Sequence, residues 1–461
     1  MKKFFMLILF VTILSMSLYA GGAGEKKVKD DVSDPLKQFS GVTLHMIAEQ
    51  SAPTDSLKTL LPDFEKMTGI KVDLETAPYD DVVQKETLAF ASGQGMYDVI
   101  SAPYEFLGNM VENGYIQSIE PFLNSPKVGL VPGFDKNDFV KKLWDACGEW
   151  KGKLYGTPAN PCTMFFGYRK DVFENEIEKK NFKSKYGYEL EIPATWKEYK
   201  DMAEFFTRKR GENLAGVKLT QDFYGVSMSG KRHPAMVFEW MNYMWSFGGA
   251  IFDEKGNLVI DSKENEAALS YYVDLAKYAP PGVTSKTWDE QTTEIQQGIV
   301  AMAILFNDCA PSIEDENESN VAGKMGYGQI PAEAMPVSHF GGWGFYIPSD
   351  SKNAEAAWLF LEWYNTPKVQ SELARQGIFP CLTSTYNDPE FASIPYWEAS
   401  KDAYDICSSR PRIPEWNNMC EVMQLELSKA IAKEKSPKAA LASVNSAFIP
   451  ILQDVLPVLY Q

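Results

Sequence analysis

Residues 42–48 read VTLHMIA, and residues 57–64, 70–74 and 97–101 read LKTLLPDF, IKVDL and YDVIS. The first stretch is mostly apolar, as in a buried strand, and apolar residues of the second recur at i, i+3, i+4 and i+7, which predicts an amphipathic helix. Gly69 is expected to end that helix. The third stretch alternates as a second strand does, and the fourth is a third strand after a helical stretch. The order β-α-β-α-β predicts an α/β fold with a largely parallel sheet.

The loops at the carboxyl ends of parallel strands are where such sheets bind ligands. These loops start near Glu49, Pro78 and Ser101. A helix-entry turn or another structural role is the alternative for residues at these positions. The candidate ligand-binding residues here are Glu49, Gln50, Tyr79, Asp80, Tyr104 and Glu105.

The N-terminus has the pattern of a secretory signal peptide. Lys2 and Lys3 precede an apolar run over residues 4–13, which is followed by small residues over 20–23. We therefore expect a signal peptide over residues 1–23, with a retained anchor as the alternative, and a flexible leader over 24–40. The first cysteine of the chain is Cys147, so no lipobox cysteine follows the signal. The mature protein is expected to be exported and soluble, in a periplasmic or extracellular location.

The length of the chain indicates its domain organisation, and its net charge limits the kinds of partner it can bind. The chain has 461 residues, and removal of residues 1–23 leaves 438, more than a single core usually supports. Two lobes are therefore expected, with helices of the second region predicted over 196–207 and 236–247. The formal charge of -17 argues against nucleic acid or an anionic membrane surface as a partner. We expect a soluble monomer.

Common catalytic and cofactor motifs are missing from the sequence. The three histidines are widely separated and form no HExxH, and the chain has no GxSxG, no GxxxxGK[ST] and no complete GxGxxG. The six cysteines form no CxxC and could be paired or free. No metal and no cofactor are expected. Because carboxylates are abundant, a pair of catalytic carboxylates, as in glycosidases, stays an alternative.

Several short motifs follow one another in a characteristic order and spacing. They are YDVI (97–100), NGYI (113–116), LYGTP (154–158), YRKDVF (168–173), PATW (193–196), WSFGG (245–249), QGIVAM (297–302) and GGWG (341–344). Together they resemble the extracellular solute-binding proteins of ABC transporters, in the group related to maltose-binding protein that takes up sugars.

This resemblance implies a periplasmic-binding-protein type II fold, with two α/β lobes joined by hinge crossings and a ligand cleft between them. By the same resemblance, the crossings are expected near Pro158, Ile304 and Ile347. One lobe would contain residues 41–157 plus 305–346, and the other residues 158–304 plus 347–461. Such hinges permit rigid-body closure of the lobes round a ligand.

The resemblance also implies a function without catalysis. The protein is expected to capture a small sugar or sugar alcohol and to deliver it to the membrane permease of an ABC importer. A binder of an amino acid or peptide on the same fold is one alternative, and a secreted glycoside-active enzyme is another.

A sugar pocket needs aromatic faces for C–H surfaces and fixed polar groups for hydroxyls. The resemblance places the indole of Trp343 against the ligand, and Gly342 would let the backbone approach closely. A core tryptophan beside a hinge is the alternative. We expect Trp343→Ala to weaken binding while leaving the melting temperature nearly unchanged.

The remaining candidates also come from the resemblance. Cys162 stands where a carboxylate is expected. Trp245 belongs to an aromatic stripe, and such stripes more often belong to a hydrophobic core than to a binding site. Arg410 and Arg412 could bind hydroxyls or a carboxylate of the ligand, and a structural salt bridge is the alternative for them. The candidates taken from these segments are Asn160, Thr163, Trp245, Trp288, Asp289, Asn307, Asp308 and Arg412.

Overall fold

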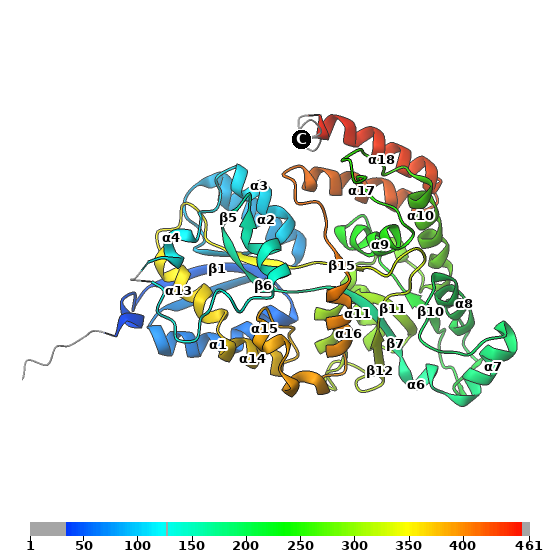
Figure 1. The fold of residues 1–461 in the computed structure, drawn as a ribbon. Coiled ribbons are helices and arrows are strands. Elements are labelled where there is room, and N and C mark those ends of the chain that lie inside the picture. The colour runs from blue at the N-terminus through cyan, green and yellow to red at the C-terminus, as the bar shows by residue number, and fades with distance from the viewer. Residues whose placement is uncertain (1–33, 126–127, 454–461) are drawn as a thin grey trace, which may run out of the picture.

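The computed structural model describes residues 34–125 and 128–453. Two lobes lie side by side, each with its own sheet and its own helices (Figure 1). The sequence-predicted α/β fold with two lobes is therefore confirmed. The expected signal peptide and residues 24–33 of the expected leader lie outside the described residues.

The first lobe is built on a five-stranded sheet with the order β2-β1-β3-β14-β6. β1 pairs in parallel with β2 and β3, and β14 runs antiparallel to β3 and β6. The predicted β-α-β-α-β order is confirmed, and the carboxyl ends of the first three strands meet at one edge. The strands are β1 (Thr43–Glu49), β2 (Lys71–Ala77), β3 (Val99–Pro103), β6 (Gly156–Asn160) and β14 (Trp343–Tyr346).

Helices of this lobe pack their apolar faces on the sheet. Gly69 caps α1 with a φ of 74°, a left-handed conformation that glycine adopts without steric cost. Phe64 of α1 contacts Phe360 and Trp363 of α13, with ring centroids 5.5 and 5.1 Å away. The helices are α1 (Ala52–Thr68), α2 (Tyr79–Ser92), α3 (Leu107–Glu112), α4 (Glu120–Leu123), α5 (Lys141–Leu143), α13 (Ala354–Tyr364), α14 (Pro367–Arg375) and α15 (Thr383–Tyr386).

The second lobe has a four-stranded sheet with the order β10-β11-β7-β12. Every residue of β11 is buried, because this strand has neighbours on both sides and helices packed over it. The strands are β7 (Met164–Arg169), β10 (Tyr224–Ser227), β11 (Val300–Phe306) and β12 (Met325–Gly328). There are also two short hairpins, β4 (Glu149–Trp150) with β5 (Lys153–Leu154) and β8 (Asn213–Leu214) with β9 (Val217–Lys218).

The helices of the second lobe enclose its largest core. The predicted helices over 196–207 and 236–247 are confirmed by α8 and α9. The helices are α6 (Lys170–Phe173), α7 (Glu176–Tyr186), α8 (Trp196–Phe206), α9 (Pro234–Ser246), α10 (Lys263–Leu275), α11 (Trp288–Gln296), α12 (Ala310–Ile313), α16 (Trp397–Asp405), α17 (Trp416–Ile431) and α18 (Pro437–Leu452).

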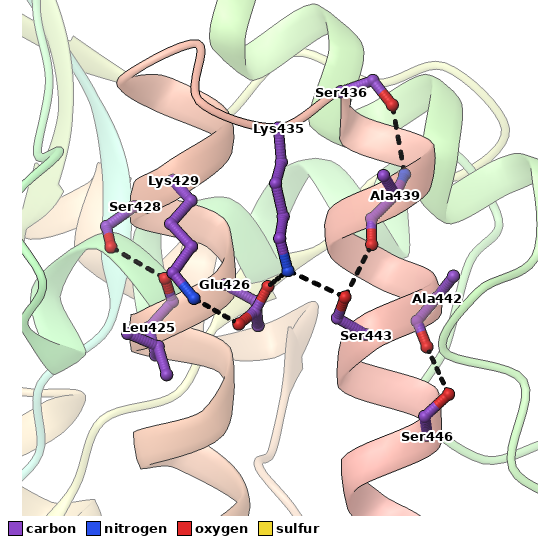
Figure 2. A network of polar contacts seen from close by, with 10 residues as sticks. All are labelled: Leu425, Glu426, Ser428, Lys429, Lys435, Ser436, Ala439, Ala442, Ser443 and Ser446. Carbon is purple, nitrogen blue, oxygen red and sulfur yellow. Dashed lines mark hydrogen bonds and ion pairs between the residues drawn. The ribbon is translucent and has the colours of Figure 1, made fainter.

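An ion-pair network joins the last two helices (Figure 2). The carboxylate of Glu426 on α17 accepts from Lys429 at 2.7 Å and from Lys435 in the following loop. Lys435 also donates to Ser443 on α18, at 2.9 Å. The side chain of Glu426 is only 9% exposed, so this loop is anchored by a carboxylate shielded from water.

Three segments carry the chain from one lobe to the other. Residues 160–163 link β6 of the first sheet to β7 of the second. Residues 340–342 lead back to β14, and residues 387–396 lead from α15 to α16, which packs against β7 and β12.

The expected division of the chain into lobes is wrong in two segments. Residues 305–340 were expected in the first lobe, but β11 continues to Phe306 within the second sheet and β12 pairs with β7. Residues 347–386 were expected in the second lobe, but α13 and α14 belong to the core of the first sheet. The apolar run of β11 is a central strand rather than a crossing, and the return occurs about 40 residues later.

The chain runs along the boundary between the lobes again before α17, without crossing it. β15 (Cys407–Ser408) pairs in parallel with β13 (Ser338–His339). Lys142 of the first lobe donates to the carbonyl oxygen of Cys407 at 3.0 Å. This segment therefore lies against both halves of the molecule.

Three further features bear on the sequence predictions. Residues 34–40 of the expected flexible leader contain a 3₁₀ turn over Pro35–Lys37, and Leu36 and Phe39 pack on the first core, so this part is not a free leader. All six cysteines are free thiols. Within the described ranges, every helix is too short or too polar to cross a membrane.

Candidate functional site

A cavity of about 620 Å³ lies between the two lobes. The first lobe lines it with the ends of β1 and β3 and the start of α2, and the second lobe with α11 and the residues after β11. The sequence-predicted candidates that line it are Glu49, Gln50, Tyr79, Trp288, Asp289, Asp308 and Trp343.

Sheet topology brings the first-lobe candidates together. Glu49 is the last residue of β1, and the backbone of Gln50 donates to the carbonyl oxygen of Ala77 at 2.8 Å. Tyr79 is the first residue of α2, directly after β2. Because β1 and β2 are parallel neighbours, side chains that follow them reach the same edge of the sheet.

A well-capped helix presents the second-lobe candidates. Trp288 and Asp289 are the first two residues of α11, whose N-terminus carries a capping box. Thr287 accepts from the backbone of Asp289, and Glu290 accepts from the backbone of Thr287 at 2.8 Å. The capping box fixes the direction in which this helix starts, and with it the two side chains at the cavity.

Three aromatic rings form one wall of the cavity. Tyr79 packs edge-on against Trp343, with ring centroids 5.9 Å apart, and against Trp288, at 5.5 Å. Trp343 is 7% exposed and belongs to β14, whereas Trp288 comes from the other lobe. The wall therefore spans the boundary between the lobes and offers the aromatic surface that C–H faces of sugars contact.

The two glycines before Trp343 are required by close packing. A Cβ atom on Gly341 would lie 2.7 Å from the ring of Phe306 and 2.8 Å from the sulfur of Cys162. A Cβ atom on Gly342 would lie 2.4 Å from the ring of Phe340. Of the two, Gly341 lines the cavity and Gly342 does not.

Three carboxyl groups of the cavity influence one another. Burial raises the pKa of Glu49 well above its ordinary value, and the charges of Asp308 and Asp289 raise it further. Burial also raises the pKa of Asp308, although Asn160 donates to its carboxylate at 3.0 Å. The pKa of Asp289 is raised by burial and by neighbouring Glu290. These groups can accept hydrogen bonds from ligand hydroxyls.

Arg410 lines the cavity, whereas Arg412 does not. The guanidinium of Arg410 lies 2.7 Å from the carboxylate of Glu105, and both side chains are buried. Tyr104 accepts from the backbone of Arg410 at 2.6 Å. The structure thus gives Tyr104 and Glu105 a supporting position behind the cavity.

Arg412 binds the backbone of the first lobe. It donates to the carbonyl oxygen of Asp145 at 2.7 Å and to that of Glu149. The sequence alone does not show which of two arginines two positions apart lines the cavity, because this depends on the residues that each side chain contacts in the folded protein.

Thr163 and Asn307 are turned toward each other rather than toward the cavity. The backbone of Thr163 donates to the amide oxygen of Asn307 at 2.9 Å, and its hydroxyl lies 2.9 Å from that of Ser338. They hold the crossing between β6 and β7 in place. Asn160 lies beside them and reaches the cavity only through Asp308.

Asp80 and Trp245 also lie outside the lining. Asp80 is 65% exposed and its carboxylate is 3.3 Å from His233 of the second lobe. Trp245 stacks on His339 and borders a separate cavity of about 340 Å³. Its place at the end of α9 turns it toward β13 and β15 instead of α11.

Sequence reasoning missed several residues that line the cavity. The ring of Phe306 and the sulfur of Cys309 flank the predicted Asp308, so the end of a buried strand could have indicated them. The side chains of Asp55, Asp315 and Glu318 come from segments without any such signal. Among the described residues, no group of three or more metal-ligating side chains could hold a metal ion.

Two α/β lobes with a cavity between them are the architecture of type II periplasmic binding proteins. The chain belongs to the family of bacterial extracellular solute-binding proteins, whose sequence profile matches residues 49–371.

Curated relatives cover much of the chain at low identity. A probable amino-acid ABC transporter periplasmic-binding protein from Sinorhizobium fredii is 22% identical over 450 residues, 95% of each chain. A mannitol-binding protein from Pseudomonas aeruginosa is 24% identical and covers 68% of this chain and 67% of its own.

A solved structure agrees with this family. The ABC transporter solute-binding protein of Agrobacterium radiobacter K84, in complex with ribitol, is 26% identical. It covers 88% of this chain and 98% of its own, with a TM-score of 0.77.

Proposed function

We propose that this protein captures a small sugar or sugar alcohol in the cavity between its lobes and delivers it to the permease of an ABC importer. One observation carries the proposal. The rings of Tyr79, Trp288 and Trp343 stand beside the carboxyl groups of Glu49, Asp289 and Asp308 in one cavity. Apolar ring surfaces and hydrogen-bond acceptors at close quarters suit a ligand that is covered with both C–H groups and hydroxyls.

The related proteins support the choice of ligand class. Mannitol and ribitol, which the Pseudomonas and Agrobacterium proteins bind by their names, are both acyclic polyols. A cavity of about 620 Å³ is of the size found for small-molecule sites. An amino acid is the competing ligand, because the Sinorhizobium relative carries that designation.

The cellular role follows from the same proposal. The protein would be exported by its N-terminal signal and would act as a soluble monomer outside the cytoplasmic membrane. Ligand binding would favour the closed arrangement of the lobes, because both lobes contact the ligand only there. No chemical change of the ligand is part of this role.

Calorimetric titration of the purified protein with sugars, sugar alcohols and amino acids tests the function. We expect stoichiometric binding of at least one sugar or polyol, with the ligand recovered unchanged. Binding of amino acids alone would favour the competing ligand class, and release of cleaved oligosaccharide products would show a glycoside-active enzyme instead.

A further inference from the structure

The charges that line the cavity are strongly unbalanced. Arg410 is the cation among the lining residues, and its guanidinium already lies 2.7 Å from the buried carboxylate of Glu105. The carboxylates in the lining are Glu49, Asp55, Asp289, Asp308, Asp315 and Glu318. The lining therefore offers a ligand acidic side chains and no unpaired positive charge.

The three inner carboxylates lack a cationic partner within the described part of the chain. No ion pair joins Glu49, Asp289 or Asp308 to a lysine or arginine there, and the donor to Asp308 is the neutral amide of Asn160. Lys231 acts electrostatically on Asp289 but does not line the cavity. Asp55, nearer the rim, is different because Lys58 donates to it at 2.8 Å.

A charged carboxylate that is shielded from water and has no counter-ion raises the free energy of the protein. A ligand that supplies positive charge therefore gains affinity by compensating such groups. A metal ion does not fit, because the described residues do not bring three such ligands together. The three carboxyl groups come from both lobes, on β1, α11 and η6 (Asn307–Cys309).

The aromatic wall favours the same kind of ligand. The faces of tryptophan and tyrosine attract ammonium groups, most strongly where water is excluded. Trp288 and its neighbour Asp289 belong to one helix turn, and Tyr79 and Trp343 continue the same aromatic wall. An ammonium group in this cavity meets both ring faces and carboxylates.

We propose that the preferred ligand is a sugar or sugar alcohol that carries an ammonium group, such as an amino sugar or an amino polyol. This inference rests on the proposed sugar- or polyol-binding function and narrows it. The hydroxyl groups of the ligand use the acceptors of the cavity, and the ammonium group compensates the inner carboxylates.

Matched ligand pairs test the inference by titration calorimetry at neutral pH. Glucosamine is compared with glucose, and 1-amino-1-deoxysorbitol with sorbitol. We expect the amine of at least one pair to bind about tenfold tighter or more than its neutral parent, which is the scale of one charge-assisted contact.

Substitutions then locate the effect. Glu49→Gln and Asp308→Asn each should weaken binding of the amine about tenfold more than they weaken binding of its neutral parent. Glu355→Gln removes the same charge from the exposed start of α13 and should leave the preference unchanged.

Two outcomes separate this inference from the proposed function. If neutral sugars or polyols bind as tightly as their amines or tighter, the inference fails and the function stands. If no sugar or polyol of either kind binds, both fail. Should a variant not fold, the ligand pairs measured on the natural protein still decide the question.

Discussion

Trp343 lies where the cavity meets the core of the second lobe, and its two surroundings give it two roles. It lines the cavity and is also packed among buried side chains of that core, with 7% of its surface exposed. The sequence-based expectation that Trp343→Ala would spare stability does not fit this burial.

We predict that Trp343→Ala abolishes measurable ligand binding and lowers the free energy of unfolding by about 3 kcal/mol, as for other large-to-small changes in cores. Trp343→Phe keeps an aromatic ring and should reduce ligand affinity and the free energy of unfolding much less. Calorimetry and chemical denaturation measure the two effects. Full stability of Trp343→Ala would mean that the site relaxes round the missing indole.

At the residue scale, the sequence could predict which positions approach the cavity but not where each side chain turns. Glu49 ends one strand and Tyr79 follows its parallel neighbour, so topology alone brings them to one edge. Asn307 and Asp308 are neighbours in sequence, yet Asn307 binds the backbone of Thr163 and only Asp308 faces the cavity. Such choices depend on partners that are far away in the sequence.

At the element scale, the N-terminus of α9 depends on a neutral histidine. His233 caps this helix by accepting from the backbone of Ala235 at 3.1 Å, and its other ring nitrogen lies 3.3 Å from Asp80 of the first lobe. Burial lowers the pKa of His233, and Lys231 lowers it further, although Asp80 and Glu290 act in the opposite direction.

A histidine with a lowered folded-state pKa binds fewer protons than in the unfolded chain, so stability falls as pH drops below the unfolded value of about 6.5. His233→Asn keeps a capping acceptor but does not titrate. We predict that the natural protein loses about 1 kcal/mol more than this variant between about pH 7.5 and about pH 5. Denaturation curves at both pH values measure this, and parallel losses would contradict it.

The loop between α17 and α18 gives a second prediction at this scale. Burial alone would raise the pKa of Glu426, but hydrogen bonds from Lys429 and Lys435 outweigh it and lower the pKa. The ion pairs of Glu426 therefore contribute their full stabilisation above the pKa of glutamate in the unfolded chain, about 4.3. This stabilisation is lost as the pH falls through the lower pKa of Glu426 in the folded protein.

Glu426→Gln should lower the free energy of unfolding by about 1 to 2 kcal/mol at neutral pH, because the charge-assisted bonds are lost. Glu421→Gln, on the exposed face of the same helix, is the matched control and should change little. Denaturation at neutral and strongly acidic pH checks both, and the difference between the variants should vanish at acidic pH.

Elements themselves were largely predictable, whereas their assignment to lobes was not. The hydrophobic periodicity of α1 and the alternation of β2 are local properties of the chain. β11 shows the limit: an unbroken apolar run fits a crossing segment as well as a central strand. Only its pairing with β7 and β10 distinguishes the two.

At the scale of the whole molecule, the lobes touch beside the cavity as well as through the crossings. Tyr79 and Asp80 open α2 in the first lobe, and they contact Trp288 and His233 of the second. These contacts form only when the lobes approach, so they favour the arrangement in which both lobes line the cavity.

The position of the segment between β15 and α17 limits how the two lobes can move relative to each other. It sends Arg410 and Arg412 into the first lobe while the chain continues into the last helices of the second. A rotation of one lobe relative to the other would break these contacts unless its axis lay close to the two side chains. A chain truncated before this segment would leave Glu105 buried without its cation, so residues 409–415 help to hold the two lobes against each other.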